Sequence, residues 1–200
     1  FNLPKRMGYW PAVLIFLSFQ LFLLADIAPN DPDRLATFVL GYWLFTFGGI
    51  VLFGADQWLN RIECFTVVFR LIGSLRVLQI ENEYRYGVPG WSSIAAAPLD
   101  ASRAVLCLMI LISGSFDGLH ETFWWLGTIG INPLEFPGRS AVVWSSSLGL
   151  LCANILGVSV YGLAIWVGLV LVREFGNVQN IQFMDAFNTF SVAILPIALG

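Results

Sequence analysis

The chain has 200 residues, of which 58% are hydrophobic and only 12% are charged, whereas about a quarter of the residues of a typical soluble domain are charged. Its mean hydropathy is +0.77, and a soluble fold of this size could not hide so much apolar surface from water. The net charge of −3, with no cluster of Lys and Arg, excludes a basic nucleic-acid-binding protein. The composition therefore predicts an all-α polytopic integral membrane protein whose solvent and first partner is the lipid bilayer.

Five apolar stretches are predicted to cross the membrane, because a crossing helix needs about 20 residues. They lie near residues 9–26, 35–56, 101–122, 140–172 and 181–200. The fourth is uncharged for 33 residues, or about 50 Å of helix, which predicts one tilted helix. We expect a single transmembrane domain over residues 1–200 and a fragment of a longer chain, because the sequence begins with Phe1 and stops within an apolar run.

The connection between the second and third spans is predicted to have two parts. Apolar residues at helical spacing between Arg61 and Arg76 predict a short amphipathic helix on the membrane surface; they are Ile62, Phe65, Phe69 and Ile72. Residues 79–85 then have the composition of a short strand or hairpin.

Basic residues are divided unequally between the two sides that five spans define. Of the ten Lys and Arg residues, two (Arg34 and Arg139) fall on one side. The other eight fall on the opposite side: Lys5, Arg6, Arg61, Arg70, Arg76, Arg85, Arg103 and Arg173. Because cytoplasmic loops are enriched in Lys and Arg, we expect the Phe1 end inside, in a bacterial cytoplasmic (inner) membrane.

The densest group of polar residues is Asp117, His120 and Glu121, at the end of the third span. On a helix these three residues lie at i, i+3 and i+4, so one face would present two carboxylates and the only histidine of the chain. Such a face predicts a divalent metal site formed by Asp117, His120 and Glu121, or catalysis by Asp117 and Glu121. The alternative is that all three are interfacial residues beside the aromatic pair Trp124-Trp125.

The remaining polar and cysteine residues are assigned structural roles. The loop of residues 26–34 contains three aspartates and two prolines, which predicts a rigid solvated turn with Asp33 as the cap of the second span. Cys64, Cys107 and Cys152 lie far apart in apolar runs, which predicts buried small hydrophobic side chains.

A stripe of small residues marks the fourth span. Gly149, Ala153 and Gly157 recur every four residues, and such a stripe lets another helix approach closely. The neighbour is predicted to be either another helix of this chain or another subunit.

Several segments resemble a family of bacterial polytopic membrane proteins labelled fenitrothion hydrolase. They are SFDG at residues 115–118, ETFWWLG at 121–127, IGINPLEFPGRSAV at 129–142, LFG at 52–54 before WL at 58–59, and LPIAL at 195–199. The resemblance implies a longer protein, with further spans before Phe1 and a Tyr/His-rich stretch after Gly200. Histidines of that stretch would be natural companions of Asp117 and Glu121. The activity in the family label is hydrolysis of organophosphate esters.

Three classes of function follow from these observations. The first is a non-catalytic subunit or scaffold of a membrane complex, with other membrane protein subunits as partners, because no common catalytic signature is present. The second is a membrane-bound hydrolase, assisted by a metal, with Asp117 and Glu121 at its centre. A transporter component is the third.

Overall fold

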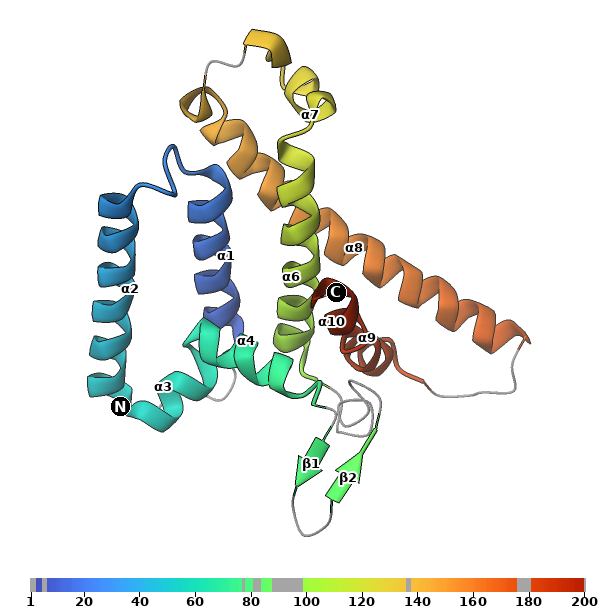
Figure 1. Cartoon of the computed structure of the whole chain (residues 1–200). Helices are drawn as coiled ribbons and strands as arrows, with labels where there is room; N and C mark the ends of the chain where they lie inside the picture. The colour runs from blue at the N-terminus through green and yellow to red at the C-terminus, as the bar shows by residue number, and fades with distance from the viewer. Residues whose placement is uncertain are drawn as a thin grey trace. The chain divides into compact units, whose positions relative to one another are not determined.

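The structure, a computed structural model, describes residues 3–4, 7–76, 78–80, 84–87, 99–135, 138–175 and 181–199. Within these ranges three helices are long and apolar enough to cross a membrane, namely α2 (Pro32–Phe53), α6 (Ala101–His120) and α8 (Val143–Phe175) (Figure 1). The prediction of an all-α helical membrane protein is confirmed. The shorter elements are α1 (Trp10–Ala25), α3 (Ala55–Arg61), α4 (Cys64–Gly73), α7 (Phe123–Thr128), α9 (Phe183–Ser191), α10 (Ile194–Leu199) and the 3-10 turns η2 (Pro133–Glu135) and η3 (Arg139–Ala141).

Two of the five predicted spans do not form a single helix of full membrane length. Helix α1 has 16 residues, or about 24 Å, which is short for an upright crossing. The predicted fifth helix is divided into α9 and α10. Pro196 follows the break and cannot donate the helical hydrogen bond to the Val192 carbonyl, so a single regular helix through both residues is disfavoured.

The connection after α2 contains both predicted parts. Gly54 joins α2 to α3 with φ +83°, a backbone conformation that suits glycine. Strands β1 (Leu78–Ile80) and β2 (Tyr84–Tyr86) pair antiparallel, with Gln79 opposite Arg85. The predicted amphipathic helix is present in shorter form as α4. Its Val67 and Leu71 are buried, whereas Phe69 is 66% exposed.

Contacts divide the chain into two compact units, and each is described by itself. The first consists of Phe1–Val67 and Ser113–Ala153. In it, aromatic rings join α1 to α2, where Phe22 stacks on Phe38 at 4.2 Å between ring centroids, and α1 to α4, where Phe19 lies edge-on to Phe65 at 5.0 Å. The N-cap of α2 is Asp31, whose carboxylate accepts a hydrogen bond from the Asp33 N–H. The prediction of Asp33 as the cap was wrong, because Pro32 occupies the first helical position and the cap precedes it.

A buried glutamate closes the turn between α3 and α4 in this first unit. Glu63 is 7% exposed. Its carboxylate accepts hydrogen bonds from the Phe65 and Thr66 N–H groups and from the Tyr42 hydroxyl of α2. Two otherwise unpaired donors at the start of α4 are thereby satisfied, so Glu63 both caps α4 and ties it to α2.

The second unit consists of Val68–Ile112 and Asn154–Gly200. Its buried centre is formed by Ala104 and Leu108 of α6 with Phe187 of α9. Tyr161 of α8 packs edge-on against the Phe187 ring at 4.9 Å, and its hydroxyl donates to the Phe187 carbonyl at 3.0 Å. The Tyr161 hydroxyl therefore links α8 to the backbone of α9.

Candidate functional site

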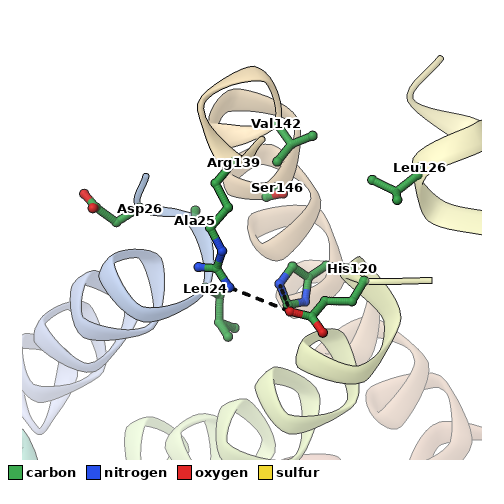
Figure 2. Close-up of a pocket in the computed structure, with 9 residues that line it drawn as sticks. Leu24, Ala25, Asp26, His120, Leu126, Arg139, Val142 and Ser146 are labelled. Carbon is green, nitrogen blue, oxygen red and sulfur yellow. Dashed lines mark ion pairs between the residues drawn. The ribbon is translucent and has the colours of Figure 1, made fainter. Parts of the chain in front are cut away.

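A pocket of about 210 Å³ lies within the first unit, where α1 and α6 end and where the segment leading into α8 begins (Figure 2). Thr122 positions the following helix, because its hydroxyl accepts a hydrogen bond from the Trp125 N–H and so caps α7. The pocket has apolar walls with charged and polar groups between them; its lining is Leu24, Ala25, Asp26, His120, Glu121, Leu126, Arg139, Val142 and Ser146.

His120 is the most buried ionisable group of this pocket, with 7% of its side chain exposed. Its Nδ1 lies 2.6 Å from the Asp117 carbonyl oxygen, and since a carbonyl only accepts, Nδ1 is the donor. The neutral ring therefore presents its lone pair on Nε2. Phe116 stacks on the imidazole at 5.8 Å between ring centroids and holds its plane.

Arg139 reaches into the same pocket from the other side. Its Nη2 lies 3.7 Å from the Glu121 Oε1, which is an ion pair but not a hydrogen bond. The Nη1 atom is buried and has no hydrogen-bond partner among the residues that the structure describes. A buried donor of a charged group without a partner is costly, so this guanidinium has capacity for a further acceptor.

Asp26, at the end of α1, is already paired. It accepts hydrogen bonds from the Ala28 N–H at 3.0 Å and from Arg34 at 2.8 Å. The Ala28 hydrogen bond, followed by Arg34 and Arg139, holds the pKa of Asp26 below its ordinary value despite the opposing effect of burial. Asp26 therefore contributes a negative charge to the pocket lining, and its carboxylate is held in place by these two hydrogen bonds.

The predicted set Asp117, His120 and Glu121 does not converge on one point. Asp117 Oδ1 lies 3.9 Å from His120 Nδ1, and Glu121 Oε1 lies 4.0 Å from His120 Nε2, so the two carboxylates flank opposite nitrogens of the ring. Both carboxylates are exposed, at 63% and 71%. No group of three or more His, Cys, Asp or Glu able to hold a metal occurs in the described part of the chain.

The predicted small-residue stripe is occupied by side chains of the chain itself. A Cβ added at Gly149 would lie 2.4 Å from the Trp125 ring and 2.9 Å from the Phe116 ring, both in the first unit. One added at Gly157 would lie 2.4 Å from Ile112 in the second unit. Ala153, which lies between these two glycines in the sequence, is half-buried. At Gly149 and Gly157 the close neighbours are therefore internal side chains.

Sequence reasoning missed the apolar and hydroxyl residues of the pocket, which are Leu24, Ala25, Leu126, Val142 and Ser146. They come from the end of α1 and from the segment after α6, and no sequence motif marks them as facing the pocket. Of the predicted buried cysteines, Cys64 and Cys107 are buried, whereas Cys152 is exposed. Comparison of the chain with protein-family models, curated proteins and solved structures finds no match, so the chemistry of the site rests on its own geometry.

Proposed function

We propose that this membrane protein is a subunit of a larger membrane assembly, and the observation that carries the proposal is the exposed apolar length of α8. Large apolar side chains are exposed along it from Trp144 (80%) through Ile155 (68%) to Val172 (41%). This run covers about 42 Å of helix. The hydrocarbon core is about 30 Å thick, and at the average tilt of about 20° the run still exceeds it. Another protein subunit covers the excess.

The proposal predicts that α8 contacts a discrete partner. A photo-reactive amino acid at Ile155 or Leu163, both largely exposed, should give one crosslinked product of defined mass when the protein is in its native membrane, since these side chains face outward. The same probe at Leu150, which is fully buried, should give none. Native mass spectrometry of the purified protein should show the partner at fixed stoichiometry. Crosslinks to lipid alone, with a monomeric mass, would contradict the proposal.

We also propose the bacterial inner membrane with the Phe1 end cytoplasmic, supported by the eight-to-two distribution of basic residues. Lys5 and Arg6 of that set lie outside the described residues. In a Cys152→Ser background, which removes the exposed native thiol, an impermeant thiol reagent added from outside should label Asn30→Cys and not Arg76→Cys. Both positions are exposed. Labelling of Arg76→Cys alone would reverse the topology.

A hydrolase is the second candidate, and the His120 geometry is the observation that favours it. The ring is held through Nδ1, so Nε2 is available as a general base toward a water molecule in the pocket. The Arg139 guanidinium lies in the same pocket and would stabilise a developing oxyanion, while Leu24 and Leu126 would hold an apolar group. Ester hydrolysis is also the activity that the family resemblance implies.

The hydrolase candidate predicts that removing the general base His120 abolishes most of the esterase activity. With a chromogenic ester and the purified protein, His120→Gln should lower kcat by roughly 10²–10⁴, because glutamine cannot take up the proton. Arg139→Gln should also lower kcat, because it removes the charge that would stabilise the oxyanion. Its matched control is Arg70→Gln, a change at an exposed arginine of α4 that should leave kcat unchanged. Unchanged kcat in a folded His120→Gln variant would remove the hydrolase candidate.

A further inference from the structure

The pocket at His120 presents polar atoms of both kinds, and they are not fully satisfied by one another. On the donor side, the Arg139 guanidinium lines the pocket; its Nη2 lies 3.7 Å from Glu121 Oε1, beyond hydrogen-bond distance, and its Nη1 is buried without a hydrogen-bond partner among the described residues. On the acceptor side, His120 Nε2 and Glu121 Oε1 lie 4.0 Å apart, and His120 Nδ1 is already used. Figure 2 shows the Arg139 side chain extended toward His120, with the ion pair to Glu121 dashed.

A ligand of a single charge does not suit this arrangement. A simple anion on Arg139 would meet the Glu121 carboxylate, which is 3.7 Å from the guanidinium. A simple cation between Glu121 and His120 would meet Arg139. A ligand that carries an anionic oxygen group next to a protonated amine satisfies both sides, because each of its charges lies opposite the complementary group.

The location of the pocket favours an amphiphilic source for such a ligand. Leu24 belongs to the last turn of the apolar helix α1, and His120 is the last residue of α6. Phe123 and Trp124, which follow directly, are 73% and 66% exposed, and exposed aromatic residues at helix ends are typical of the membrane–water interface. Phospholipid headgroups lie at this depth, and the Leu126 and Val142 walls suit the adjoining apolar part.

We propose that this pocket binds an aminoalkyl phosphodiester, the headgroup of a zwitterionic phospholipid with a primary amine. The phosphate oxygens accept hydrogen bonds from the Arg139 guanidinium, whose planar donors match phosphate geometry. The ammonium donates to Glu121 Oε1 and to the lone pair of His120 Nε2. Glu121 is 71% exposed, so it can adjust its position without disturbing buried structure. The inference does not depend on either proposed function.

The test is lipid retention by the full chain in native mass spectrometry and lipid-dependent thermal stability in mixed micelles. Phosphatidylethanolamine should bind about tenfold more tightly than phosphatidylcholine, whose quaternary ammonium has no N–H, and than phosphatidylglycerol, which has no amine. Soluble phosphoethanolamine forms a separate arm. If it stabilises the protein as well as the lipid does, the same chemistry is recognised in a water-soluble ligand; if only the lipid does, the headgroup in the membrane is the ligand.

Variants separate this site from general lipid contact. Glu121→Gln should remove the roughly tenfold preference for phosphatidylethanolamine, and because this side chain is exposed, folding should persist. Arg139→Gln should instead weaken the binding of all three lipids, because each of them carries the phosphate that Arg139 contacts. Arg70→Gln, which removes an exposed arginine elsewhere, should keep the preference. Equal binding of the three lipids by the unaltered protein, an unchanged preference in folded Glu121→Gln protein, or unchanged lipid affinity in folded Arg139→Gln protein would overturn the proposal.

Discussion

Replacing Gly49 with alanine should destabilise the protein by about 1–3 kcal/mol, the usual range for overpacking of a tight contact. A Cβ at this position would lie 2.1–2.3 Å from three atoms of the Trp58 indole. The indole cannot easily withdraw, because it is 6% exposed, stacks on Phe53 and meets Phe45 edge-on. The apparent melting temperature in detergent should fall by roughly 2–4 °C for each kcal/mol.

The neighbouring residue offers a matched control for this prediction. A Cβ at Gly48 would have nothing within 4 Å, so Gly48→Ala should leave stability unchanged or raise it by up to about 1 kcal/mol through helix propensity. Gly49→Ala should cost less stability in a Trp58→Leu background than in the unaltered protein, because the indole that its Cβ would meet is then absent. Equal melting temperatures of the Gly48→Ala and Gly49→Ala proteins would contradict the close contact between Gly49 of α2 and Trp58 of α3.

Glu63→Ala should cost about 2–3 kcal/mol, because it removes a buried charged acceptor and the cap of α4 in one change. The Phe65 and Thr66 N–H groups and the Tyr42 hydroxyl would then lose their common acceptor. Tyr42→Phe removes one donor only and should cost less. Glu135→Ala, at an exposed glutamate of the same unit, is the control and should leave the melting temperature unchanged.

Glu63 also makes the stability of the folded protein depend on pH. Burial raises the pKa of Glu63, but hydrogen bonds from Thr66, Tyr42 and Phe65 outweigh burial and hold the pKa below its ordinary value. A carboxylate with a lowered pKa in the folded state contributes stability above its unfolded pKa, and this contribution is lost as the pH falls through the folded pKa. The melting temperature should therefore drop below about pH 4, and this part of the drop should be absent in Glu63→Gln.

The fold class could be predicted from the sequence because apolar runs near membrane length dominate it. Helices α2 and α6 lie within a few residues of the predicted spans, and α8 begins and ends three residues later than predicted. The division of the last segment into α9 and α10 was not predicted. An apolar run shows that a segment avoids water but not whether its helix is continuous, and the position of Pro196 is the signal that marks the break.

The candidate site was predicted only in part, for a geometric reason. Asp117 does lie one turn before His120, but a helical spacing does not specify where each side chain points, and α6 ends at His120. The Asp117 carbonyl accepts a hydrogen bond from the His120 Nδ1–H, and Glu121, just beyond the helix, lies beside the opposite nitrogen. No sequence pattern marks Glu63, because it is a single glutamate between two short helices and its partner Tyr42 lies 21 residues earlier in the chain.

Helix α8 has no proline between Val143 and Phe175, and so it lacks the commonest cause of a sharp bend. A continuous helix of about 50 Å exceeds a hydrocarbon core of about 30 Å even at the average tilt of about 20°. Any further tilt would move the two ends of the helix apart in the plane of the membrane. A change in bilayer thickness that altered the tilt would therefore be felt at the ends of α8 as a lateral displacement.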